Sequence, residues 1–259
     1  MYQEERLIGI LEFLQRNNRI SVEQICSLFA VSRDTARRDL VKLEEEQAII
    51  RTRGGAILPA YHNEVKSYSN RLTMVSIEKK SIGKKAAMLI YPRDRIILDA
   101  STTVQSCAEQ LNNINCTIIT NSINQADLLS TKSEMNIQLL GGTLEKDHRY
   151  LYGPSVISKL SEYLVDKAFI GVVGISEHGL TVAHEEDGIV KRKMMQQAKQ
   201  VIVLADSTKL GKSDFFRFAE IRDIDLLITD RTPSQAFREL LTKHNVELLT
   251  TDLHEIGDD

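Results

Sequence analysis

Apolar residues in the first part of the chain recur at the spacing of helix faces, in three groups that capping residues separate. The first group, with i, i+3, i+4 and i+7 spacing, is Leu7, Ile10, Leu11 and Leu14. A second helix starts at the capping-box sequence 21–24, and its expected apolar face is Ile25, Leu28 and Phe29. A third starts at the N-cap Ser32, and the side chains expected to be buried are Ala36, Leu40 and Leu43. Two capped helices joined by so short a turn predict a helix-turn-helix.

Two short alternating stretches follow the third helix. Residues 49–52 and 56–58 are typical of strands, and the glycines at 54 and 55 can take the positive φ of a tight hairpin. We therefore predict a winged helix-turn-helix over residues 1–58. Residues 59–75 are polar and weakly patterned, so we interpret them as a linker.

From residue 76 the pattern changes to helices that alternate with short, continuous apolar runs. Helices are expected at 76–91, 104–111 and 125–130. Strands are expected at 95–98, 117–120, 137–140, 168–173, 201–204 and 226–229. Strands that are apolar on both faces suit a parallel sheet covered by helices on both sides. We therefore predict a second, α/β domain over residues 76–259 with a mostly parallel sheet.

The third helix and the hairpin share a set of basic and hydroxyl side chains. On a helical wheel, Thr35, Arg38 and Lys42 lie opposite the buried stripe, so Arg38 is the side chain we expect to enter the major groove. The other arginines are expected to hold the phosphate backbone. The predicted DNA contacts are Ser32, Arg33, Thr35, Arg37, Arg38, Lys42, Arg51 and Arg53.

The acidic residues nearby allow two interpretations. Asp34 could accept from a cytosine amine or form an ion pair with Arg37 or Arg38, and the ion pair is preferred. Asp39 is expected to orient an arginine locally. Glutamates 44–46 are expected to form a solvated helix face.

Small polar residues follow several of the predicted strands. Ligands of parallel sheets bind at the carboxyl ends of strands, and hydroxyl residues at a helix N-terminus favour an anion. The recurrence of such residues, with one lysine, predicts a pocket for a small, polyhydroxylated, phosphorylated compound. The predicted effector contacts are Asp99, Ser101, Thr102, Thr103, Asn121, Ser122, Gly141, Gly142 and Lys209.

Both halves of the chain resemble the DeoR family of bacterial transcription regulators. In the first half the resemblance rests on Val31-Ser32-x-x-Thr35-x-Arg37-Arg38-Asp39-Leu40 and Arg53-Gly54-Gly55-Ala56. In the second half it rests on Asp99-x-Ser101-Thr102-Thr103, Thr120-Asn121-Ser122, Gly141-Gly142, 166–171, 179–181 and Asp206-Ser207-x-Lys209-x-Gly211. The resemblance implies an effector domain related in fold to pentose-phosphate isomerases and CoA transferases. It also implies that Asp99, Ser101, Thr102, Thr103 and Lys209 hold a sugar phosphate, although the family often has glycine where Ser101 stands.

Catalysis is not expected. In the related isomerases, acidic residues follow the strand that here ends in valines and glycines, which cannot move protons. The segment 190–194 is similar to the one that supplies a catalytic glutamate in those enzymes, and Arg192 stands in its place. Residues 185–187 are interpreted as a solvated acidic loop near the pocket, with a general base assisted by His184 as the alternative.

Composition sets further bounds. The net charge of −3 does not by itself indicate a nucleic-acid binder, so the placement of the arginines carries that inference. Three cysteines without a paired spacing are expected to be reduced thiols, and the six histidines show no metal-site spacing. We expect no metal, no cofactor, no membrane span and a cytoplasmic location.

Together these features predict a DNA-binding regulator, most simply a repressor of a carbohydrate-catabolism operon, controlled by a phosphorylated sugar or related metabolite. Its partners would be double-stranded operator DNA and further copies of itself, as a dimer or tetramer, because helix-turn-helix units read paired half-sites. The alternatives are an isomerase-like enzyme carrying a DNA-binding domain and a regulator that senses a non-sugar ligand.

Overall fold

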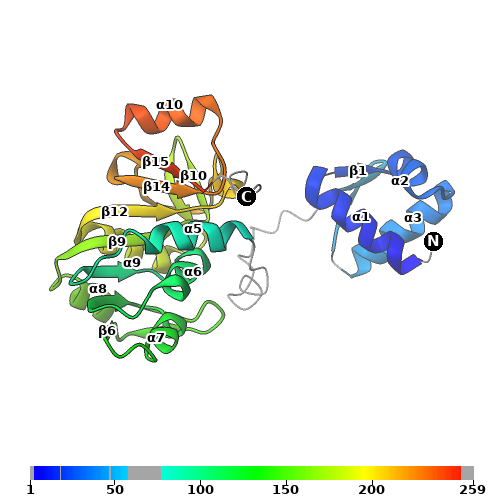
Figure 1. The fold of residues 1–259 in the computed structure, drawn as a ribbon. Helices are drawn as coiled ribbons and strands as arrows, with labels where there is room; N and C mark the ends of the chain where they lie inside the picture. The colour runs from blue at the N-terminus through cyan, green and yellow to red at the C-terminus, as the bar shows by residue number, and fades with distance from the viewer. Residues whose placement is uncertain (1–2, 18, 47, 58–76, 252–259) are drawn as a thin grey trace, which may run out of the picture. The chain divides into compact units, whose positions relative to one another are not determined.

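The computed structural model describes residues 3–17, 19–46, 48–57 and 77–251. The chain divides into two compact units, 1–64 and 65–259, and each is considered by itself (Figure 1). The whole of the predicted linker 59–75, and Leu58 of the predicted wing, lie outside the described residues.

The N-terminal unit consists of three helices and a small sheet. Its helices are α1 (Gln3–Asn17), α2 (Val22–Phe29) and α3 (Arg33–Glu45). Its strands are β1 (Arg19–Ser21), β2 (Ile50–Thr52) and β3 (Gly55–Ile57), in the antiparallel order β1-β3-β2. The turn between β2 and β3 contains Gly54 with φ 93°, as the hairpin requires. Strand β1 was not expected. A side chain at Gly55 would lie 2.0 Å from the carbonyl oxygen of Ile20 in β1, which explains that glycine.

The predicted caps and most of the predicted core of this unit are confirmed. Ser21 and Gln24 form the reciprocal capping box, and Ser32 accepts from the Thr35 N–H. Leu28, however, was predicted to be buried and is 52% exposed. Helix α2 is short, and its buried side chains are Val22 and Ile25, so Leu28 falls outside the stripe that faces α3.

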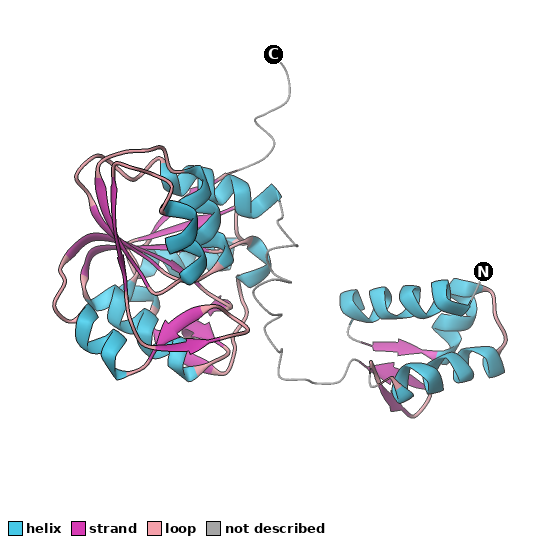
Figure 2. Cartoon of the chain, turned by 90° about the horizontal axis from the view of Figure 1, so that it is seen from below, coloured by secondary structure: helices cyan, strands magenta, loops and turns pink. Residues whose placement is uncertain are grey.

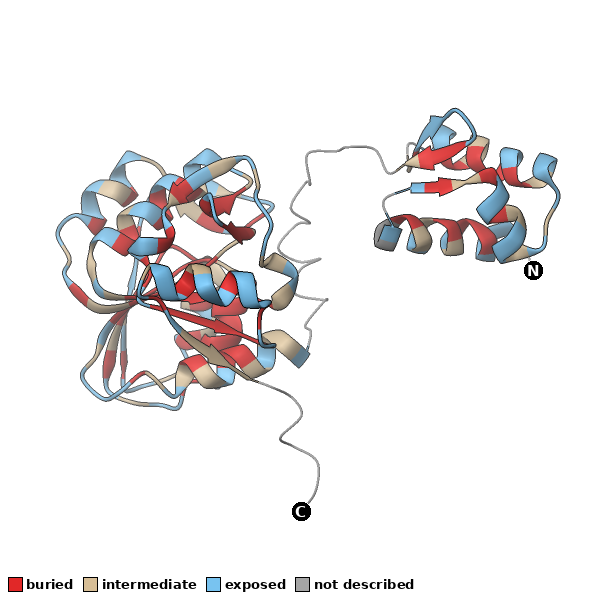
Figure 3. Ribbon diagram, turned by 90° about the horizontal axis from the view of Figure 1, so that it is seen from above, coloured by how far each residue is buried: buried red, intermediate tan, exposed pale blue. Residues whose placement is uncertain are grey.

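The C-terminal unit is built on a seven-stranded sheet in the order β15-β14-β12-β9-β4-β5-β6, with every neighbouring pair parallel. Its strands are β4 (Arg95–Leu98), β5 (Cys116–Thr120), β6 (Met135–Leu139), β9 (Val165–Gly171), β12 (Ala198–Leu204), β14 (Leu226–Thr229) and β15 (Glu247–Thr250). Most residues of the central strands β4, β5, β9, β12 and β14 are buried, as Figure 3 shows.

Helices cover both faces of this sheet, as predicted (Figure 2). One apolar core lies under α5 (Ile77–Ala87), α6 (Thr102–Gln110) and α7 (Ile123–Leu129). The other lies under α8 (Pro154–Leu160), α9 (Glu185–Gln196) and α10 (Gln235–Lys243). Residues 185–187, expected in a solvated loop, instead form the first turn of α9. Carboxylates are favourable there because the helix N-terminus carries partial positive charge.

Smaller elements decorate the carboxyl ends of the strands. An antiparallel sheet consists of β10 (Gly174–Ser176), β11 (Gly179–Val182) and β13 (Phe216–Ala219), and a separate hairpin consists of β7 (Thr143–Glu145) and β8 (Tyr150–Tyr152). Short 3₁₀ turns, η1 (Ser207–Lys209) and η2 (Ile221–Asp223), complete the fold.

The order of the strands places a crevice between β4 and β9. The chain runs from β4 through β5 to β6 on one side and returns to β9 on the other side of β4. Parallel sheets bind ligands at such a switch point, outside the carboxyl ends of the two strands. Asp99 follows β4, and Gly171 is the last residue of β9, so both residues lie at this switch point.

Candidate functional sites

Helix α3 and the wing present their arginines to solvent. The side chains of Arg33, Arg37, Arg38, Arg51 and Arg53 are exposed. Ser32 is also exposed, whereas Thr35 and Lys42 are half-buried. Because Ala36, Leu40 and Leu43 are buried on the opposite side, as predicted, the helix has one apolar face and one basic face. The exposed residues of this set are therefore accessible to DNA. The DNA contacts themselves stay a prediction.

Two of these arginines already have acidic neighbours. Arg33 lies 3.5 Å from Glu23, and Arg51 lies 3.4 Å from Glu44. Exposed ion pairs contribute only about 0–1 kcal/mol, so a phosphate can replace either carboxylate. Within the described residues, no ion pair joins Asp34 to either of the arginines expected to hold it, so the preferred interpretation of Asp34 finds no support.

Asp39 has a different role from the one expected. It is fully buried, and its partner is Arg6 of α1 rather than a neighbouring arginine of α3. Arg6 Nε donates to Asp39 Oδ2 at 2.7 Å, and Nη2 donates to Oδ1 at 3.0 Å. This hydrogen bonding raises the pKa of Arg6, so the guanidinium stays charged. A helical wheel shows only neighbours on the same helix, which is why the sequence pattern missed this contact.

The crevice between β4 and β9 contains a small, partly open cavity of about 40 Å³. Its walls come from the two strand ends, from the β7–β8 hairpin and from the start of α9. The lining residues are Ala100, Ser101, His148, Tyr150, Gly171, Val172, Val173, Val182, Ala183, His184, Asp187 and Lys191.

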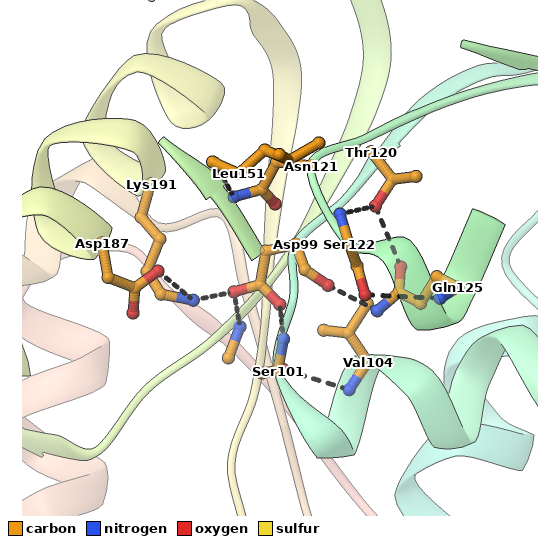
Figure 4. A network of polar contacts seen from close by, with 11 residues as sticks. Asp99, Ser101, Val104, Thr120, Asn121, Ser122, Gln125, Leu151, Asp187 and Lys191 are labelled. Carbon is orange, nitrogen blue, oxygen red and sulfur yellow. Dashed lines mark hydrogen bonds and ion pairs between the residues drawn. The ribbon is translucent and has the colours of Figure 1, made fainter. Parts of the chain in front are cut away.

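A buried ion pair between Asp99 and Lys191 lies at the base of this cavity (Figure 4). Lys191 Nζ donates to Asp99 Oδ2 and lies 3.7 Å from Asp187 Oδ1. Asp99 also accepts from the Gly171 N–H at 2.7 Å and from the Ser101 N–H at 2.8 Å. Asp99 therefore ties the ends of β4 and β9 to α9, and Lys191 brings one positive charge into the crevice.

The end of β9 approaches the β4 loop too closely for a side chain. A Cβ at Gly171 would lie 2.1 Å from Ser101 Oγ. That oxygen caps α6 by accepting from the Val104 N–H at 3.2 Å. Thr102 and Thr103 occupy the first turn of α6 and are buried, and neither lines the cavity. Among the predicted contacts after β4, Ser101 therefore lines the cavity, and Asp99 accepts from the Ser101 N–H.

The predicted effector contacts that follow β5 form hydrogen bonds with other residues of the protein. Ser122 accepts from the Gln125 N–H at 3.3 Å, and Gln125 donates to the Asp99 carbonyl oxygen at 2.5 Å, which links the ends of β5 and β4. Asn121 donates to the Leu151 carbonyl oxygen at 2.9 Å and so holds the hairpin. Neither Asn121 nor Ser122 lines the cavity.

The two predicted glycines after β6 also lie away from the cavity. A Cβ at Gly142 would lie 2.4 Å from the Tyr152 carbonyl oxygen and 2.6 Å from Val156, so the approach of the hairpin and α8 explains that glycine. The expectation that the missing side chain admits a ligand is therefore not supported at Gly142. Gly141 has open space around its Cβ position.

The lysine at the cavity is Lys191, and the predicted Lys209 does not line it. Lys209 is half-buried in η1, after β12, and is not among the residues that line the cavity. Lys191, which sequence reasoning passed over, reaches the cavity from α9. The i, i+4 spacing of Asp187 and Lys191 was the available signal, because it places both side chains on one side of a helix.

Tyr150 contributes a hydroxyl to the cavity, whereas Arg192 does not line it. Burial, together with the nearby carboxylates of Asp187 and Glu145, raises the pKa of Tyr150, so its hydroxyl remains a hydrogen-bond donor. Arg192, expected at the place of a catalytic glutamate, turns away and donates to the carbonyl oxygens of Phe218 and Arg217.

Two other features concern metal binding and membrane insertion. In the described part of the chain, no group of three or more histidines, cysteines or carboxylates is placed to hold a metal ion. No helix among the described residues is long and apolar enough to cross a membrane.

Comparisons with known proteins agree with both units. Residues 6–61 match the model of the DeoR-like helix-turn-helix domain, and residues 75–231 match that of the DeoR C terminal sensor domain. The chain is 68% identical to the HTH-type transcriptional repressor GlcR of Bacillus subtilis, over 98% of this chain and 99% of that protein. It is 29% identical to the glycerol-3-phosphate regulon repressor of Escherichia coli, over 96% and 99%.

Among solved structures, the chain is similar to ribose 5-phosphate isomerase A from Methanocaldococcus jannaschii, with 21% identity and a TM-score of 0.38 over 51% of this chain and 53% of that one. It is also similar to eIF2B beta from Chaetomium thermophilum, with 14% identity and a TM-score of 0.45 over 98% and 73%.

Proposed function

The chain belongs to the DeoR family of transcriptional regulators, and we propose that it is an operator-binding repressor controlled by a phosphorylated sugar or related metabolite. The observation that carries the effector proposal is the ammonium group of Lys191, buried in the crevice between β4 and β9. The printed name of the Escherichia coli relative, a glycerol-3-phosphate regulon repressor, supports an effector of this class.

The crevice offers groups that match both parts of such a molecule. Lys191 and the N-terminus of α6, which Ser101 caps, favour an anion such as a phosphate. The hydroxyl of Tyr150 and the imidazoles of His148 and His184 can exchange hydrogen bonds with sugar hydroxyls. We propose that Lys191, rather than Lys209, is the phosphate ligand.

The hydrogen bonds that Asp99 accepts fit a site that binds a ligand without converting it. Asp99 already accepts from two backbone N–H groups and from Lys191, so most of its acceptor positions are occupied by groups of the protein. The strand end of β9 contributes only glycine and valine. We therefore propose a sensor rather than an isomerase. Conversion of a pentose phosphate by the purified protein, followed by NMR, would contradict this part of the proposal.

The test of the effector class is a ligand screen. Triose, pentose and hexose phosphates are compared with their unphosphorylated counterparts by thermal unfolding of the full-length protein. A ligand at 100 times its Kd stabilises by about 2.7 kcal/mol. The proposal expects stabilisation only by phosphorylated members, together with a change in operator affinity measured by fluorescence anisotropy. Stabilisation by an unphosphorylated or non-sugar metabolite alone would refute it.

The phosphate ligand is tested with two matched variants, Lys191→Met and Lys209→Met. Each removes one positive charge and keeps a long apolar side chain. Lys191→Met should weaken binding of the stabilising phosphate by at least about ten-fold, since a charge-assisted hydrogen bond contributes roughly 1.5–3 kcal/mol. Lys209→Met should bind almost as the unaltered protein does. The reverse result would return the phosphate site to Lys209.

An oligomer is part of this proposal, because two recognition helices are needed to read two half-sites. We propose a dimer or a higher even-numbered assembly. Light scattering of the protein with and without operator DNA measures it, and a monomer on DNA would contradict it.

A further inference from the structure

The cavity beside Lys191 is far smaller than a ligand site. Its volume is about 40 Å³, whereas pockets for small metabolites span roughly 300–1,000 Å³. A sugar phosphate therefore requires one wall to move. The strand ends of β4 and β9 belong to the central sheet, which leaves the β7–β8 hairpin and the start of α9 as the walls that could separate.

The hairpin is attached firmly on one side. The Leu151 N–H donates to the Asn121 carbonyl oxygen at 2.8 Å, and Asn121 Nδ2 donates to the Leu151 carbonyl oxygen at 2.9 Å. The Ile123 N–H donates to the Arg149 carbonyl oxygen at 3.3 Å. These bonds join residues 149–151 to the segment between β5 and α7 and can act as a hinge.

On the other side, the contacts with the start of α9 include a pair of rings. The centroid of the His148 ring lies 5.1 Å from that of His184, which precedes α9 as its N-cap residue. No backbone hydrogen bond joins residues 143–152 to residues 183–196 in the described chain. His148 is nevertheless buried, and Tyr150 stacks on it at 6.4 Å. The contact across the mouth of the cavity thus narrows it without a strand ladder that would hold it permanently.

One atom near the hinge supports movement here. Asn121 Oδ1 is buried and accepts no hydrogen bond from any described residue. A buried acceptor without a donor destabilises the conformation that leaves it so. A ligand hydroxyl or a water that enters when the hairpin lifts would supply that donor.

We propose that the hairpin 143–152 is a lid over the effector site, hinged at Asn121 and latched by His148 against His184. This inference rests on the proposed function only for the identity of the effector, because the lid is a property of the ligand-free protein. When the latch opens, His148 and Tyr150 become residues that contact the effector.

The experiment is hydrogen exchange of the full-length protein without any ligand, followed by mass spectrometry. Peptides covering 143–152 should exchange faster than those covering β9, because the lid opens locally. His148→Ala should speed exchange in 143–152 by about 2- to 10-fold, the factor that an aromatic pair contributes to an equilibrium. His184→Ala removes the same contact from the other side and should produce the same increase.

His178→Ala is the matched control, since His178 is an exposed histidine elsewhere in this unit and should leave 143–152 unchanged. The double variant His148→Ala/His184→Ala should exchange no faster than either single variant, because both remove one latch. Additive effects, or exchange in 143–152 that is as slow as in β9 in every variant, would overturn the proposal. The ligand screen can succeed or fail independently of this result.

Discussion

The buried ion pair between Arg6 and Asp39 joins helix α1 to the recognition helix α3, and its removal should disable DNA binding by unfolding the N-terminal unit. Asp39 is fully buried, and the Arg6 side chain is only 9% exposed. Arg6→Ala leaves the Asp39 carboxylate without its guanidinium in a place that water hardly reaches. Only the hydrogen bond from Gln3 at 3.0 Å remains among the bonds that the structure shows at Asp39.

The cost of the substitution, compared with the stability of the N-terminal unit, decides whether that unit stays folded. Removing one partner of a buried pair costs about 3–5 kcal/mol. A unit of the size of residues 1–64 has a total stability of roughly 3–10 kcal/mol, at about 0.05–0.15 kcal/mol per residue. The substitution therefore consumes a third of that stability or more. The sensor unit, which has its own two cores, should keep its stability.

The assay is urea unfolding followed by circular dichroism, with operator affinity measured in parallel by anisotropy. Arg6→Ala should move an early transition to lower urea and leave the later one in place. Arg6→Met combined with Asp39→Leu replaces the pair by apolar side chains and should recover most of the stability, because no charge is then left buried. If Arg6→Ala unfolds at the same urea concentration as the unaltered protein and binds operator equally well, the reasoning about this pair is wrong.

Three further predictions concern Arg38, Cys107 and Asp166. Arg38→Ala should weaken operator binding by several-fold or more without changing the unfolding midpoint, as anisotropy and circular dichroism would show; equal affinity removes Arg38 from the contact set. Burial raises the pKa of the Cys107 thiol, so a thiol reagent should label the half-buried Cys26 first and Cys107 only on unfolding. The hydrogen bond from Lys199 lowers the pKa of Asp166, so this carboxylate stabilises the fold above about pH 4 and loses that contribution as the pH falls further. Asp166→Asn should therefore destabilise the protein at neutral pH more than at pH 3, and equal losses at both would refute the assignment.

The sequence by itself determined the local elements of both units. Helix stripes, caps and the glycine turn depend on residues within a few positions of one another, so Ser21, Ser32 and Gly54 could be placed without a structure. The apolar runs of the strands, and the polar residues that follow them, also depend on residues within a few positions of one another. That was enough to predict a winged helix-turn-helix followed by a parallel α/β domain with a site at its strand ends.

Only the tertiary structure decided which strand ends meet. The return of the chain from β6 to β9 places Asp99 beside Gly171 and forms the cavity between these strand ends, which Lys191 lines and Lys209 does not. The partners of Asp39 and His148 lie 33 and 36 positions away along the chain, on other elements. Such pairings depend on strand order and helix packing, and no local periodicity carries that information.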